Sequence, residues 1–142
     1  MTQFIWPHIL TSEYACPHCG KLPHEIKATH VPYIYEILFD SFKVIRETWG
    51  KPIKINSGYR CPEHNQQVGG ELLSAHLFGL ALDLDCRDSA EVGELSALIE
   101  AEFPLIRMGR YTKKGSFIHI DIAYHIIPRM SEAWVEGVRW TG

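Results

Sequence analysis

Two short segments of this chain alternate strictly between large aliphatic side chains and smaller or polar ones, and they constrain the fold most. The first is GLALDLDC, residues 79–86, and the second is SFIHIDI, residues 116–122. A period of two residues is typical of β-strands, because successive side chains point to opposite faces of a sheet. Each segment therefore predicts a strand with one aliphatic face towards a core and one face that carries carboxylate or imidazole groups.

The rest of the pattern predicts a single α+β domain over residues 1–142, with no repeat or linker. Apolar residues at three- and four-residue steps predict helices over 31–49 and 88–103. Further strands are expected at 51–57 and 105–111, and a turn at 113–115 joins the latter to the second alternating strand, which extends over 116–123. We expect residues 1–30 to be irregular and residues 58–75 to form a long loop. Trp134 and Trp140 are expected on a short helix over the sheet.

Charge and hydropathy exclude several classes of function. The net charge of −3 argues against a broad phosphate-binding surface, so we expect no nucleic-acid partner. No apolar run is long enough to predict a membrane span. The opening MTQFIWPHIL lacks the basic and apolar regions of a secretory signal, so synthesis in the cytoplasm is expected. The pattern does not indicate an oligomeric state.

The polar faces of the two alternating strands suggest a metal site. The chain has eight histidines, and His76 lies just before the strand that carries Asp83, while His119 lies on the later strand. Two imidazoles and a carboxylate, with a fourth position open to water, form a ligand set of catalytic zinc. Arg60, in the segment SGYR, is placed to clamp a carboxylate or an oxyanion in the same cleft.

These segments resemble the M15 metallopeptidases. The signature S-x-H-x-x-G-x-A-x-D is matched by residues 74–83, and a later single histidine is matched by His119. The similarity covers roughly residues 10–125 and is closest to the M15A-type group of D-Ala-D-Ala carboxypeptidases and phage cell-wall peptidases. It implies zinc ligands at His76, Asp83 and His119 and a substrate-binding arginine at Arg60. It also implies the fold shared with hedgehog domains, α+β with a central antiparallel sheet and flanking helices.

One departure from the family concerns the general base. Family members carry an acid three residues before the last ligand or a histidine two residues before it, where this chain has Ser116 and Phe117. Asp121 is the nearest substitute, either as the base or as a partner that orients a metal-bound imidazole. Asp85, His64 and His125 are further candidates.

The resemblance implies a zinc peptidase that cleaves peptidoglycan stem peptides through a metal-activated water. The activity is either that of a D-Ala-D-Ala carboxypeptidase or that of an endopeptidase such as a phage or prophage lysin, acting at the cell wall after phage-type release. The alternative is a non-catalytic, zinc-stabilised module that binds the cell wall or serves as a phage structural part. The missing family base favours this alternative.

The four cysteines leave several arrangements open. Cys16 and Cys19 have the spacing of structural zinc ligands, and His18 between them is a further donor. Cys61 and Cys86 complete either a four-cysteine site or two disulfides, including a Cys61–Cys86 pair. We favour reduced thiols, with a second zinc at Cys16 and Cys19 as the minor alternative.

Overall fold

The centre of the molecule is a five-stranded sheet. The computed structural model describes residues 3–27, 29–71, 74–125 and 136–142. The strand order is β3-β4-β6-β5-β7. Their bounds are Ile55–Ser57 for β3, Ala81–Asp85 for β4, Phe117–Asp121 for β6, Arg107–Tyr111 for β5 and Arg139–Thr141 for β7. The first four are antiparallel neighbours, but β7 pairs with β5 in parallel. The α+β class is confirmed, and the sheet is mixed where a central antiparallel sheet was expected.

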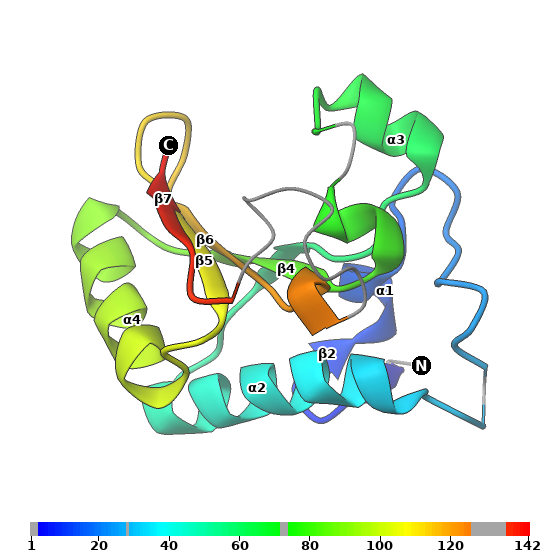
Figure 1. Ribbon diagram of the computed structural model, residues 1–142, viewed down its shortest axis with the longest axis horizontal. Coiled ribbons are helices and arrows are strands. Elements are labelled where there is room, and N and C mark those ends of the chain that lie inside the picture. Colours follow the sequence, from blue (N-terminus) through cyan, green and yellow to red (C-terminus); the bar gives the residue numbers. More distant parts are fainter. Residues whose placement is uncertain (1–2, 28, 72–73, 126–135) are drawn as a thin grey trace.

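Two helices pack on the aliphatic face of this sheet. Helix α2 spans Tyr33–Trp49 and α4 spans Ser89–Glu102, close to the predicted bounds (Figure 1). Helix α2 ends at Gly50, whose φ of 80° lies in the left-handed region that glycine adopts at little cost. The core between helices and strands is fully buried and mostly aliphatic: Leu38, Phe42, Ile45, Leu80, Leu82, Leu84, Leu95, Ile99, Ile118 and Ile120. The alternating segments therefore place their aliphatic side chains as predicted.

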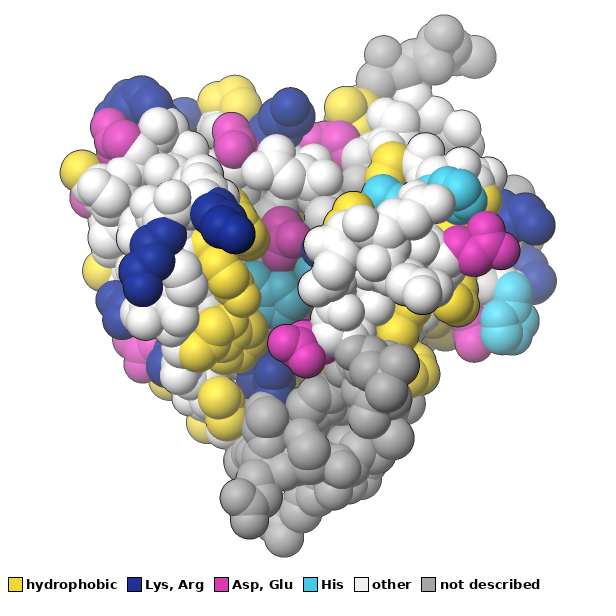
Figure 2. Space-filling model, turned by 90° about the horizontal axis from the view of Figure 1, so that it is seen from above, with side chains coloured by type: hydrophobic (Ala, Val, Ile, Leu, Met, Phe, Trp, Pro, Cys, Tyr) yellow, Lys and Arg dark blue, Asp and Glu magenta, His cyan; other side chains and the backbone are white. Residues whose placement is uncertain are grey.

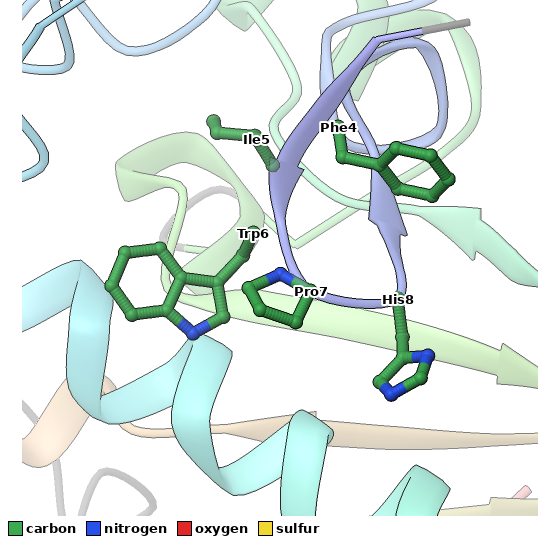
Figure 3. A pocket seen from close by; sticks show the side chains of 5 residues that line it. All are labelled: Phe4, Ile5, Trp6, Pro7 and His8. Carbon is green, nitrogen blue, oxygen red and sulfur yellow. The ribbon is translucent and has the colours of Figure 1, made fainter.

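The N-terminal region is more regular than expected. It forms a small hairpin, β1 at Phe4–Trp6 and β2 at Ile9–Leu10, followed by α1 at Thr11–Tyr14. The indole Nε1 of Trp6 donates to Oδ1 of Asp40 on α2 at 2.9 Å, which ties the hairpin to that helix. Residues 4–8 line an open surface pocket at this hairpin (Figure 3). The sequence did not predict this hairpin, because a contact with a distant helix produces no periodic pattern in such a short segment.

Two other expectations need correction. The segment 58–75 contains helix α3 at Pro62–Gln67, and the 3₁₀ helix η1 at Ala75–Phe78 begins at its end. Trp140 lies on β7 rather than on a helix, because its backbone pairs with Gly109 of β5. Trp134 lies outside the described residues. A second 3₁₀ helix, η2, spans Ala123–His125. Within the described ranges, no helix is both long and apolar enough to cross a membrane.

Candidate metal centre

One row of paired residues runs across all five strands and positions the site. Ser57 pairs with Asp83, Asp83 with His119, His119 with Gly109, and Gly109 with Trp140. Directly opposed residues project from the same face of a sheet. This face is opposite the one that α2 and α4 cover. Asp83 and His119 are therefore brought together by strand register alone.

His76 reaches the row from η1, just before β4. The hydroxyl of Ser74 caps η1 by accepting from the backbone N–H of His76 at 3.2 Å. Gly79 ends η1 with a φ of 72°, and its carbonyl accepts a 2.7 Å bond from the hydroxyl of Tyr14. The Nδ1 of His76 lies 2.6 Å from the carbonyl oxygen of Gly58, a partner that can only accept. Nδ1 must therefore carry the proton, which leaves the lone pair of Nε2 directed at the site.

His119 presents its other nitrogen to the site. Its Nδ1 lies 2.9 Å from Oδ1 of Asp83, and the Nε2 of His76 lies 3.2 Å from the same oxygen. One donor atom from each of His76, Asp83 and His119 lies within 4.8 Å of the others. Both imidazoles have their second nitrogen hydrogen-bonded away from the site, as is usual for metal-bound histidines. The donor types and their orientation fit a Zn²⁺ ion.

Burial and neighbouring charge shift the ionisation of this cluster. Burial lowers the pKa of His76, which favours the neutral imidazole that a metal requires. Burial also opposes the charged form of His119, but its hydrogen bonds to Asp121 and Asp83 outweigh burial and raise its pKa to about 9. Burial disfavours the Asp83 carboxylate, yet the imidazoles of His76 and His119 hold its pKa well below its usual range. Asp83 is therefore ionised at neutral pH.

Arg60 extends from the end of β3 to the same cluster. Its Nη2 donates to Oδ2 of Asp83 at 3.2 Å, and its Nε donates to the hydroxyl of Ser57 at 3.1 Å. A third bond runs from Nη1 to Oδ1 of Asn65 at 3.3 Å. Burial lowers the pKa of Arg60 and Asp83 opposes that shift, so the guanidinium stays charged. The structure thus places a fixed cation beside the three donors.

Asp121 lies behind His119 rather than beside Asp83. Its Oδ2 accepts from Nε2 of His119 at 2.7 Å, and its Oδ1 accepts from Nε of Arg107 at 2.9 Å and from the backbone N–H of Ala123 at 3.2 Å. Only 1% of Asp121 is exposed. Burial would raise its pKa, but the His119 hydrogen bond and the charges of His119 and Arg107 lower it. Asp121 is therefore an ionised carboxylate whose two oxygens are both occupied.

The other candidate bases lie elsewhere or outside the described side chains. Asp85 is exposed and accepts from the side-chain amide of Asn56 at 3.0 Å. His64 lies on α3, where its ring stacks on that of His18 with 6.2 Å between centroids. The side chain of His125 lies outside the described residues. We call His76, Asp83 and His119 the triad. Among the described residues, Asp121 is the one further carboxylate that forms a hydrogen bond with a member of this triad.

Three residues around His119 were missed by the sequence analysis. Arg107 pairs opposite Asp121, and its guanidinium lies 5.2 Å from the ring centroid of Trp140. The indole of Trp140 lies 5.3 Å from the ring of His119 and donates from Nε1 to the hydroxyl of Tyr111 at 2.7 Å. Gly109 leaves room for that indole, since a Cβ there would lie 2.8 Å from Cζ2 of Trp140. The sequence carried one signal for them. Along the predicted strand 105–111, Gly109 lies between Arg107 and Tyr111 on the same face.

One face of the molecule is hollowed. Figure 2 shows histidine and acidic side chains at the floor of a depression, with hydrophobic side chains along one wall. His76 and Asp83 are buried, and His119 is partly exposed. Access to the donor cluster is therefore through the partly exposed ring of His119.

Comparison with known proteins identifies the family of the chain. The profile of a family described as Peptidase M15 matches residues 10–121, which include Arg60, the three donors and Asp121. No curated protein matches the chain. The match extends from β2 to the end of β6 and so covers four of the five strands of the sheet. On this evidence the chain belongs to the M15 peptidase family.

Proposed function

We propose that the protein is a zinc-dependent peptidase of the M15A type that acts on peptidoglycan stem peptides. The observation that carries the proposal is the donor set of His76, Asp83 and His119, whose atoms lie within 4.8 Å of one another. The second nitrogen of each imidazole is fixed by a hydrogen bond, to Gly58 and to Asp121. Preorganised donors of this type support metal-assisted hydrolysis.

The chain's own residues have distinct roles in this proposal. A bound Zn²⁺ would lower the pKa of a water molecule and polarise the substrate carbonyl. Asp83 and the two imidazoles would hold the ion. Arg60 contacts Asp83, so its guanidinium lies beside the donor cluster. From there it would hold a substrate carboxylate or a developing oxyanion. Asp121 would act through His119 by fixing its tautomer and its orientation.

The position of Arg60 bears on the choice of substrate. If the guanidinium binds a free C-terminal carboxylate, the reaction is removal of a terminal D-alanine, as in a D-Ala-D-Ala carboxypeptidase. If it stabilises the oxyanion of an internal bond, the reaction is an endopeptidase cleavage such as a phage lysin performs.

Mass spectrometry of purified peptidoglycan fragments tests the proposal. Zinc-loaded protein is incubated with pentapeptide stems and with cross-linked dimers, and a His119→Ala variant serves as the inactive control. Loss of one terminal alanine identifies a carboxypeptidase, and separated dimers or internal cuts identify an endopeptidase. Unchanged fragments, with zinc measured in the wild-type protein, would overturn the peptidase proposal for these substrates.

The second candidate function is a non-catalytic module that binds wall peptides. The observation that favours it is the engagement of Asp121 by His119, Arg107 and Ala123, which leaves both carboxylate oxygens occupied. This candidate requires stem peptides to bind without being cleaved. Binding measured by calorimetry with the same fragments, together with no change in their masses, would support it.

A further inference from the structure

A second cluster of metal-ligating side chains lies apart from the triad. The Sγ atoms of Cys16, Cys19 and Cys61 all lie within 4.8 Å of one another. The first two belong to the loop after α1, and Cys61 is the N-cap of α3. None of the three forms a disulfide, and Cys86 lies outside the group, so neither a Cys61–Cys86 pair nor a site with all four cysteines is formed.

Backbone N–H groups are directed at these sulfurs. The N–H of Cys61 donates to Sγ of Cys16 at 3.4 Å, and the N–H of His64 donates to Sγ of Cys61 at 3.4 Å. A tight turn, in which the N–H of Gly20 donates to the carbonyl of Cys16 at 2.7 Å, brings Cys19 back towards Cys16. Burial opposes the thiolate, but N–H donors led by Cys61 bring the pKa of Cys16 to about 7. These contacts favour the thiolate form that binds metals.

The ligand spacing matches structural zinc sites. Cys16 and Cys19 form a C-x-x-C pair, and Cys61 and His64 form a C-x-x-H pair. Pairs with this spacing from two chain segments are typical of Cys₃His zinc sites. His64 lies three residues after Cys61 in the first turn of α3, and its backbone N–H contacts Sγ of Cys61, while its ring nitrogens lie outside the group of donor atoms within 4.8 Å of one another. His18, the other imidazole here, is exposed and lies 3.2 Å from Oε2 of Glu63.

We propose that Cys16, Cys19, Cys61 and His64 bind a structural zinc ion, separate from the triad. This ion would join the N-terminal segment to the segment that carries Arg60. The two segments already meet through a 2.7 Å bond from the N–H of Tyr59 to the carbonyl of Tyr14. Because Arg60 directly precedes Cys61, the second ion would fix the position of the guanidinium beside Asp83.

Cobalt substitution under reducing conditions tests this site without any activity measurement. The triad contains no thiolate, so thiolate-to-cobalt charge-transfer absorption reports on the cysteine cluster alone. We expect this band in the wild-type protein and its loss in Cys19→Ser, a substitution at an exposed position that leaves the core intact. Zinc content should fall from two ions per chain to one in the same variant. Circular dichroism verifies that the variant is folded.

Matched variants make the assignment specific. Cys86→Ala is the control, because Cys86 is a buried cysteine outside the cluster. The charge-transfer band of this variant should be the same as that of the wild-type protein. His64→Ala should weaken cobalt binding, whereas His18→Ala should not. A wild-type protein without the band, or with two thiols already lost to a disulfide as purified, would overturn the proposal. An unchanged affinity in His64→Ala would overturn the assignment of the fourth ligand. If the triad binds no metal, the thiolate-to-cobalt absorption band should still appear, so the two proposals can fail separately.

Discussion

His119 Nε2 lies 2.7 Å from Oδ2 of Asp121, on the side of the imidazole that faces away from the other two donors. Nδ1 of the same ring lies 2.9 Å from Asp83. An ionised carboxylate can only accept, so Asp121 assigns the proton of neutral His119 to Nε2 and leaves Nδ1 as the nitrogen that would bind the proposed metal. Arg107 in turn holds Asp121 with a 2.9 Å bond. The cluster of His76, Asp83 and His119 is therefore supported by a chain of hydrogen-bonded partners that begins at Arg107 on β5.

Asp121→Asn should weaken zinc binding by about 10- to 100-fold, the usual effect of removing a carboxylate that supports a metal-bound histidine. Competition with a chromophoric chelator measures this affinity. At saturating zinc, kcat should recover towards the wild-type value, because the residue acts through His119. Asp85→Asn, at an exposed carboxylate on the same strand face as Asp83, is the matched control. Wild-type zinc affinity combined with lost turnover would identify Asp121 as the general base instead.

Arg60→Ala should reduce kcat/KM on the cleaved stem peptide by about 100-fold or more, the typical effect of removing an oxyanion donor. Arg60→Lys should not restore it, because an ammonium cannot replace the planar fork that contacts Ser57, Asn65 and Asp83. Arg110→Ala, at an exposed arginine on β5, is the control. A fall in melting temperature with unchanged kcat/KM would show that Arg60 serves only as a structural ion pair.

Much of the site followed from local patterns in the sequence. The two-residue period placed Asp83 and His119 on polar strand faces, and the short spacing from His76 to Asp83 kept those donors in one local unit. Gly79 allows the turn between them with its φ of 72°. These features depend on neighbours in the chain, so a sequence pattern can record them.

The parts that were missed depend on pairing between distant segments. Trp140 reaches His119 only because β7 joins β5 in parallel, and a three-residue strand has too few positions to show a period. The arrangement of the cysteines was left open, because Cys61 joins Cys16 across 45 residues of sequence. The role of Gly109 follows from the indole packed against it, which the local sequence does not reveal.

Gly109→Ala should destabilise the protein by about 1–3 kcal/mol, because the added methyl group overpacks against the indole of Trp140. It should also move the indole away from His119 and so change the tryptophan fluorescence. Gly93→Ala is the matched control, since its Cβ would meet nothing within 4 Å on helix α4. That substitution should stabilise the helix by roughly 0.5–1 kcal/mol. Equal melting temperatures for the two variants would contradict the packing argument.

The metal-free protein should lose the stability that His119 contributes as the pH rises from about 6.5 to 9. Asp121 and Asp83 overcome the effect of burial and raise the pKa of folded His119 to about 9, whereas an unfolded histidine titrates near 6.5. The folded state therefore binds this proton more tightly. Its contribution is fully present below about pH 6.5 and is lost as the pH passes through about 9. The contribution of His119 to the free energy of unfolding should fall by about 1.4 kcal/mol per pH unit within this window.

Urea unfolding in EDTA and a reducing agent, repeated across this pH range, measures the slope. His119→Gln is the control, because it keeps a polar side chain between Asp83 and Asp121 but has no proton to lose. Other titrating groups, the thiols included, affect both proteins, so the difference between the two slopes isolates His119. Zinc-loaded wild-type protein should lack the decline, since the ion occupies the Nδ1 that the proton would otherwise hold. Parallel slopes for wild type and variant in EDTA would show that His119 is not the group whose proton stabilises the metal-free fold.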